Sequence, residues 1–210
     1  MVTIDQNANT LTCSVKADAF GDDTITLRAT DSGNKSVDDI FEFMINPVND
    51  PPLFTKGPNI EQSEDNGSTT IQGWASGISK GPSNESAQTL TFNVSNDNED
   101  LFGTQPAIDS GGTLTFTQLP DAFGEATVTV SLMDNGGTAN SGDDTSDEQT
   151  FTITLTPVND PPSFTKGSDQ TVNEDAGEQT VQGWATNLSK GPTNESSQSL
   201  SFITENNNEA

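Results

Sequence analysis

The chain has 210 residues, 32 of them acidic and 7 basic, and its formal net charge is −25. This charge excludes nucleic-acid binding and docking on an anionic membrane surface, because both need a positively charged protein surface. Only 29% of the residues are hydrophobic, which raises disorder as an alternative, but 11 phenylalanines and alternating runs of Val, Ile, Leu and Thr favour a β-protein with a thin core. There is no histidine and one cysteine, Cys13, so histidine-based catalytic pairs and an intrachain disulfide are excluded as well.

The first 47 residues predict short strands and no helix. Polar and apolar side chains alternate with a period of two at 10–15, 24–29 and 41–45. The segments between these runs carry turn residues, with Asp-Ala-Phe-Gly at 18–21 and Asp-Ser-Gly-Asn at 31–34. The same order of strands and turns is predicted for residues 101–157. Equivalent residues are 103 positions apart before an acidic insertion in the second copy and 110 positions apart after it.

A proline-rich motif divides the chain. Residues 47–52 read Pro-Val-Asn-Asp-Pro-Pro and recur at 157–162, 110 residues later. Proline fixes φ and removes a backbone donor, so the motif is typical of a stiff joint between domains. The segments that begin with the two motifs, 47–100 and 157–210, agree at about 30 of 54 positions, which marks a true repeat.

The repeat predicts three units. Residues 1–50 read as the C-terminal half of one repeat, 51–160 as a complete repeat and 161–210 as the N-terminal half of the next, as in a window from a longer array. About seven short strands in ~100 residues predict an all-β fold, an antiparallel two-sheet sandwich. The termini of such a sandwich lie at opposite poles, so the half repeats are expected at opposite ends of the complete one.

The order and spacing of these motifs resemble the cadherin-like repeat, and the Val-Asn-Asp-Pro-Pro form is similar to the tandem repeats of large bacterial surface proteins and adhesins. The resemblance covers the whole chain. It implies a Greek-key sandwich of the cadherin and immunoglobulin type, an extracellular location on the bacterial cell surface, and calcium bound between successive repeats. The many acids agree with this cation, because calcium takes several carboxylate and carbonyl oxygens at once.

Carried over by position, the resemblance implies a set of calcium ligands. These are Asn49, Asp50, Asn159 and Asp160 in the linkers, Glu64 and Glu174 early in the domain, Asp18 and Asp121 at the Asp-Arg-Glu turn, and Asp31 and Asp134 at the Asp-x-Asp strand end. The turn lacks its Arg-Glu, and the first Asp-x-Asp position is Ala29 or Leu132. One calcium per joint, or none, is therefore expected. The alternative is that the linker Asn and Asp are ordinary turn residues.

The predicted function is a non-catalytic, calcium-stiffened spacer or adhesion module, with neighbouring repeats and a cell-surface glycan or protein as partners. Glu64 and Asp65 are neighbours on an extended segment, so their side chains should diverge and form no acid–base pair. The alternative is a carbohydrate-binding module that uses exposed Trp74 and Trp184 as sugar platforms, although a core role is expected for both. A third possibility is homophilic adhesion by strand exchange. No apolar run is long enough for a membrane span or a signal peptide, so no membrane insertion is expected in this segment.

Overall fold

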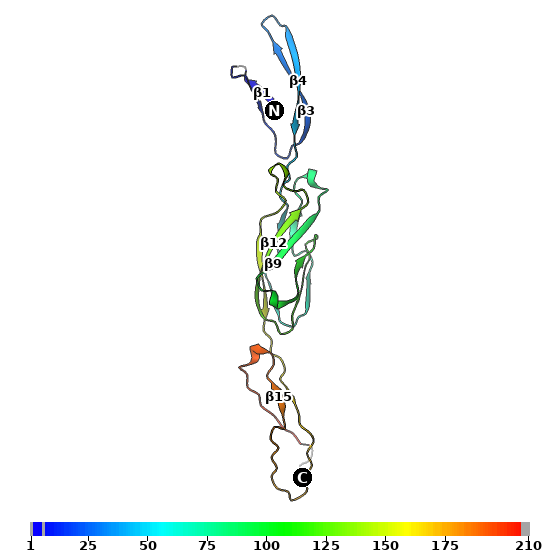
Figure 1. Ribbon diagram of the computed structural model, residues 1–210, viewed down its shortest axis with the longest axis vertical. Coiled ribbons are helices and arrows are strands. Elements are labelled where there is room, and N and C mark those ends of the chain that lie inside the picture. Colours follow the sequence, from blue (N-terminus) through cyan, green and yellow to red (C-terminus); the bar gives the residue numbers. More distant parts are fainter. Residues whose placement is uncertain (1, 6, 207–210) are drawn as a thin grey trace.

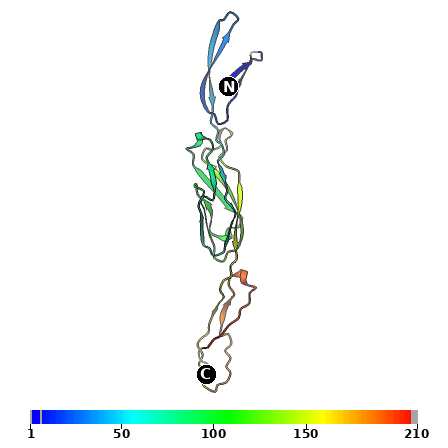
Figure 2. The same cartoon turned by 180° about the vertical axis from the view of Figure 1, so that it is seen from behind.

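The computed structural model describes residues 2–5 and 7–206, so residues 1, 6 and 207–210 of the predicted terminal halves lie outside the described residues. The molecule is a rod of three parts that lie end to end, with the N-terminal part at one end and the C-terminal part at the other (Figure 1). The view from behind shows the same order (Figure 2). The described residues form strands and short 3-10 turns, which confirms the all-β class. None of their helices is long and apolar enough to cross a membrane.

The N-terminal part consists of two antiparallel hairpins. Strand β1 (Val2–Asp5) pairs with β2 (Thr10–Cys13), and β3 (Gly21–Thr30) pairs with β4 (Ser36–Ile45). The turn between β3 and β4 is closed by Asp31, whose Oδ1 accepts hydrogen bonds from the backbone N–H groups of Gly33 and Lys35, both at 2.9 Å. The predicted strands of this part are therefore present, and β3 and β4 extend beyond their predicted ends.

The central part contains the strands of one complete repeat. Its first half holds β5 (Leu53–Thr55), β6 (Ile60–Ser63), β7 (Ser68–Ile71), β8 (Ser76–Ser79), the 3-10 turn η1 (Ser83–Glu85) and β9 (Leu90–Asn96). Its second half holds η2 (Glu99–Leu101), β10 (Phe102–Ile108), β11 (Leu114–Gln118), β12 (Gly124–Asp134), η3 (Ala139–Ser141) and β13 (Gln149–Thr156).

These strands form a four-stranded sheet in the order β6-β13-β12-β9, a three-stranded sheet in the order β10-β11-β7, and the pair β5-β8. One pair differs from the antiparallel prediction, because β6 and β13 run parallel. The two strands are separated by most of the domain, and no hairpin turn forces them to run in opposite directions. Both run toward the second joint, where the chain leaves the central part.

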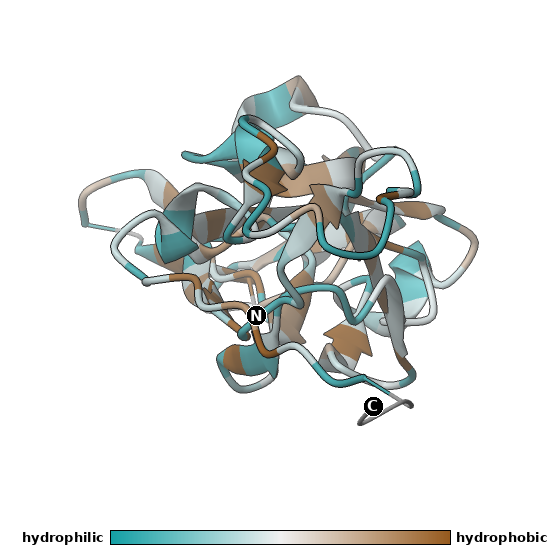
Figure 3. Ribbon diagram, turned by 90° about the horizontal axis from the view of Figure 1, so that it is seen from below, coloured by the Kyte–Doolittle hydropathy of each residue, from teal (hydrophilic) through white to brown (hydrophobic). Residues whose placement is uncertain are grey.

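One hydrophobic core lies between the two sheets. Alternate residues of β12 are fully buried, from Ala126 through Val128 and Val130 to Leu132, as the period of a strand requires. Leu114 and Phe116 of β11 face them in the same cluster, whose members all fall within residues 54–155. Seen along the rod, hydrophobic and hydrophilic segments follow each other along the chain, and the outermost loops are mostly hydrophilic (Figure 3).

Trp74 belongs to this core. Its ring packs on Phe151 with the centroids 4.3 Å apart, and its Nε1 donates to the carbonyl oxygen of Pro58 at 3.0 Å. Because only 3% of the residue is exposed, it offers no platform for a sugar ring. The prediction of a core role is therefore confirmed for Trp74, although the residue lies in the turn between β7 and β8 and not in a strand.

The C-terminal part has the same course as the first half of the central part but fewer strands. Strand β14 (Ser163–Thr165) pairs with β15 (Thr186–Ser189), and the 3-10 turn η4 (Thr193–Glu195) follows. Trp184 repeats the hydrogen bond of Trp74, since its Nε1 donates to the carbonyl oxygen of Ser168 at 2.9 Å. Its side chain is 38% exposed, so the expected core role is wrong for Trp184 in this part.

Candidate metal centre

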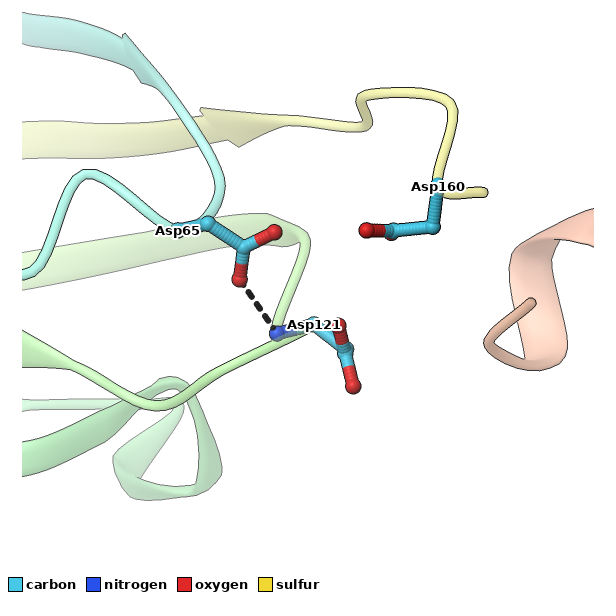
Figure 4. Close-up of side chains that lie close together, drawn as sticks. All are labelled: Asp65, Asp121 and Asp160. Carbon is cyan, nitrogen blue, oxygen red and sulfur yellow. Dashed lines mark hydrogen bonds between the residues drawn. The ribbon is translucent and has the colours of Figure 1, made fainter. Parts of the chain in front are cut away.

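Three aspartates meet at the second joint, where the central part passes into the C-terminal part. Asp65 lies in the turn after β6, Asp121 in the turn between β11 and β12, and Asp160 in the linker after β13. One carboxylate oxygen from each lies within 4.8 Å of the others, and this is the only such acidic group among residues 2–5 and 7–206. Figure 4 shows the side chains of Asp65 and Asp160 directed toward one another across the joint.

Backbone conformation brings two of these aspartates to the pole of the domain. Asp65 and Asp121 have φ values of 64° and 56°, in the left-handed region that aspartate tolerates better than most residues. Asp65 Oδ1 accepts a hydrogen bond from the backbone N–H of Asp121 at 2.8 Å, the dashed line in Figure 4. The two turns are thereby tied together, and both carboxylates are held at the end of the domain.

Glu64 connects the central part to both sides of the joint. Its side chain is 2% exposed, and Oε1 accepts hydrogen bonds from the backbone N–H of Val158 at 2.7 Å and from Nδ2 of Asn194 at 3.3 Å. Its other oxygen, Oε2, is buried and has no hydrogen-bond partner. A buried carboxylate oxygen without a donor is unfavourable, so it marks a place where a cation would be stabilising.

Glu195 of η4 supplies a carboxylate from the other side of the joint. It is 3% exposed, and its Oε1 accepts a hydrogen bond from the backbone N–H of Asp160 at 2.6 Å. The second oxygen of Glu195 is also buried without a partner, as are Oδ2 of Asp160 and Oδ1 of Asn194. The joint therefore gathers unpartnered oxygens from the central part, the linker and the C-terminal part.

The electrostatics of Asp160 reflect this crowding. The pKa of its carboxyl group is raised above the ordinary value, first by burial and then by the negative charges of Asp65, Asp121, Glu195 and Glu64. Each of these effects disfavours the ionised form. No basic side chain forms an ion pair with these acids in the part of the chain that the structure describes. A divalent cation would have the opposite effect, because its charge favours the ionised form of every carboxyl group around it.

The first joint is held by hydrogen bonds. Asn49 Nδ2 donates to Asp134 Oδ1 at 3.0 Å and to the carbonyl oxygen of Asp143 at 2.6 Å, while Asn49 Oδ1 accepts from Gln88 at 2.5 Å. The backbone N–H of Asp50 donates to Glu85 at 2.9 Å, as Asp160 does to Glu195. One oxygen each of Glu85 and Asp134 is buried without a partner.

The structure divides the predicted ligands between several places. Glu64, Asp121 and Asp160 come together at the second joint, and Asn49, Asp50 and Asp134 at the first. Asp18 lines an open pocket at the first joint together with Asp50 and Asn84. Asn159 accepts a hydrogen bond from Gln198 at 2.7 Å. Asp31 bonds within its own turn, and Glu174 is exposed in the stretch between β14 and β15.

Sequence reasoning missed Asp65 and Glu195 as candidate ligands. The sequence analysis assigns Asp65 no ligand role and considers it only as an acid–base partner of Glu64, but its left-handed φ turns the chain there and brings its carboxylate to the joint. Glu195 lies in an Asn-Glu-Ser run at 194–196 that recurs at 84–86. The signal that could have found both residues is their exact repetition, as Asp65 and Asp175 and as Glu85 and Glu195.

Comparison of the chain with models of protein families finds no match, and comparison with curated proteins also finds none. A function must therefore be inferred from the geometry of the joint.

Proposed function

We propose that this segment is a non-catalytic spacer and adhesion module of an extracellular, adhesin-like surface protein, built from cadherin-like repeats whose joints are stiffened by calcium. The observation that carries the proposal is the meeting of Asp65, Asp121 and Asp160 at a joint between two repeats. Their ligand oxygens lie within 4.8 Å of one another although they come from three separate elements.

The composition of the joint suits calcium. Calcium takes six to eight oxygens in a flexible arrangement, and it accepts carboxylates, amide oxygens and water. The central part supplies Glu64, Asp65 and Asp121, the linker supplies Asp160, and the C-terminal part supplies Glu195. The group contains no sulfur or imidazole ligand that would favour zinc.

The mechanical role follows from the origin of the ligands. An ion held by acids from both sides of the joint would resist bending, since bending would separate the carboxylates that share it. Without the ion, the carboxylates around Asp160 repel one another. Calcium would then bind the ordered joint in preference to the disordered one and stabilise it by mass action.

The strand arrangement supports the finer fold assignment. The sheets of four and three strands that enclose one core have the strand numbers of an immunoglobulin-type sandwich. Because β9 pairs with β12 and β7 pairs with β11, each sheet contains strands of both halves, as expected for a Greek-key path. The carbohydrate-binding alternative loses one of its two platforms, since Trp74 is buried.

A calcium titration with two matched variants tests the metal site. Glu64→Gln keeps the size of the side chain but removes its charge, so calcium affinity measured by calorimetry should fall on the order of tenfold. Glu174→Gln makes the same change at the equivalent position of the repeat, where the side chain is exposed, and should leave the affinity unchanged.

Small-angle scattering provides the mechanical readout of the same experiment. Calcium should narrow the distribution of rod lengths in the unchanged protein and in Glu174→Gln, and should have a weaker effect on Glu64→Gln. If millimolar calcium produces neither heat nor a change in scattering, the joint binds no calcium and the proposed stiffening is wrong.

A further inference from the structure

The central part contains two Asn-Gly pairs, Asn66–Gly67 between β6 and β7 and Asn135–Gly136 between β12 and β13. In such a pair the backbone nitrogen of the glycine can attack the side-chain amide carbon of the asparagine, because glycine has no Cβ to hinder the approach. Both pairs carry the same reactive groups, so their surroundings in the folded protein decide which of them can react.

The pair at Asn135 is held by hydrogen bonds on both of its reacting groups. Oδ1 of Asn135 accepts from the backbone N–H of Thr89 at 2.8 Å, and the backbone N–H of Gly136 donates to Oδ1 of Asp134 at 2.8 Å. The space beside Gly136 is also filled, since an added Cβ would clash with the side chain of Asn49. The side chain and the attacking nitrogen can therefore meet only after both hydrogen bonds have opened.

The pair at Asn66 is open in each of these respects. Asn66 is exposed, and its side chain makes one long hydrogen bond, from Nδ2 to Oε1 of Gln62 at 3.4 Å. Among residues 2–5 and 7–206, no acceptor is found for the backbone N–H of Gly67. A Cβ added to Gly67 would meet nothing within 4 Å. Nothing in the surroundings of this pair restrains the approach of the nitrogen to the amide carbon.

The fold does not require an asparagine at this place. The C-terminal part has Ala176–Gly177 at the equivalent positions. The turn has the same conformation there, because Asp175 and Gly177 have φ values of 64° and 68°, and Asp65 and Gly67 have values of 64° and 73°. Asn66→Ala is therefore a substitution that the turn accepts.

We propose that Asn66 is a site of spontaneous deamidation in the folded protein, whereas Asn135 is protected from it. The Gly67 nitrogen loses its proton to hydroxide and attacks Cγ of Asn66, and ammonia leaves as the new C–N bond forms. Water then opens the cyclic succinimide, at Cγ to give aspartate or at the backbone carbonyl to give isoaspartate. The net reaction consumes one water and releases one ammonia, so it needs no oxidant, reductant or cofactor.

The modified residue directly follows two acids of the joint, Glu64 and Asp65. The aspartate product adds one negative charge and leaves the backbone unchanged. The isoaspartate product continues the chain through the former side chain, which inserts a carbon into the backbone of the turn. This insertion disturbs the left-handed conformation of Asp65 and its hydrogen bond to the backbone N–H of Asp121, which Figure 4 shows.

Peptide mass spectrometry of the 210-residue chain, incubated in EDTA at mildly alkaline pH, tests the proposal. In the folded protein Asn66 should convert at least about tenfold faster than Asn135, because Asn135 reacts only after two hydrogen bonds open. In guanidinium chloride these bonds are lost, so the two rates should become similar. Near-ultraviolet circular dichroism of the core around Trp74 verifies the folded sample. A folded protein in which Asn66 converts no faster than Asn135, or a difference in rate that persists after unfolding, would overturn the proposal.

The consequence for calcium rests on the proposed function and has its own readout. A chain aged until most of its Asn66 is isoaspartate should bind calcium at least about tenfold more weakly in calorimetry, because Asp65 is displaced. Fresh Asn66→Asp carries the added charge on an unaltered backbone and should bind at least as tightly as the fresh unchanged chain. Aged Asn66→Ala cannot convert at this position and should retain its affinity.

The two readouts fail independently. If the aged chain binds calcium as tightly as the fresh one, isoaspartate at 66 does not disturb the joint, and that consequence is wrong. A fresh chain that binds no calcium contradicts the proposed function alone, since the conversion of Asn66 is measured in EDTA.

Discussion

Leu114→Ala should lower the free energy of unfolding of the central part by about 2–5 kcal/mol, because it removes three carbons from a closed core and leaves a cavity. A domain of this size has a total stability of roughly 5–15 kcal/mol, so this change consumes a large fraction of it. Leu114 is completely buried between the two sheets of the central part. The chain contains a natural control in Leu11, the same residue at the equivalent position of the N-terminal part.

Leu11→Ala should change stability by less than about 0.5 kcal/mol, since Leu11 is exposed and its removal creates no cavity. Denaturant unfolding followed by Trp74 fluorescence in a Trp184→Phe background measures both variants. Equal losses of stability for Leu114→Ala and Leu11→Ala would contradict the division into one closed core and two open halves.

Asp160→Asn should weaken calcium binding on the order of a hundredfold, because it removes the charge from the carboxylate that faces all the other acids of the joint. The same variant should raise the melting temperature of the calcium-free protein. Burial and the charges of Asp65, Asp121, Glu195 and Glu64 raise the pKa of Asp160, so its ionised form is unfavourable in the folded joint. The backbone bond from residue 160 to Glu195 does not depend on the side chain and is retained.

The pH dependence of the calcium-free protein has a defined sign. A carboxyl group whose pKa is raised in the folded state destabilises the fold at pH values above that pKa. This destabilisation decreases as the pH falls through the folded pKa, and it is absent below the unfolded pKa of about 3.9. The melting temperature should therefore rise in this window through Asp160, and Asp160→Asn should remove that component of the rise. Asp50→Asn is the control, because Asp50 belongs to no acidic triad among the described residues. A variant at 160 that lowers stability at neutral pH would contradict the electrostatic explanation.

Much of the fold could be predicted from the sequence because its signals are local. The alternation that buries Ala126, Val128 and Val130 is visible within one strand, and the Pro-Val-Asn-Asp-Pro-Pro motif marks both joints. The parallel pairing of β6 with β13 was not predictable, because it connects residues more than 90 positions apart without a turn that sets their direction.

The candidate site was predicted in part for the same reason. Asp121 and Asp160 were found from their positions in the repeat, whereas Asp65 depends on a left-handed turn and Glu195 on a 3-10 turn that folds back onto the linker. Neither conformation follows from hydrophobic periodicity. Asp31 and Glu174 occupy the repeat positions of Asp134 and Glu64, but neither lies at one of the two joints. Asp31 bonds within its own turn, and Glu174 is exposed.

Cys13 of β2 is the one cysteine of the chain, and it stands where the central part has the buried Phe116. Its side chain is partly exposed, so a thiol reagent would label the protein at a single place in the N-terminal part. A dye attached there would follow the motion of that part relative to the central part, which gives the bending of the first joint a direct optical readout.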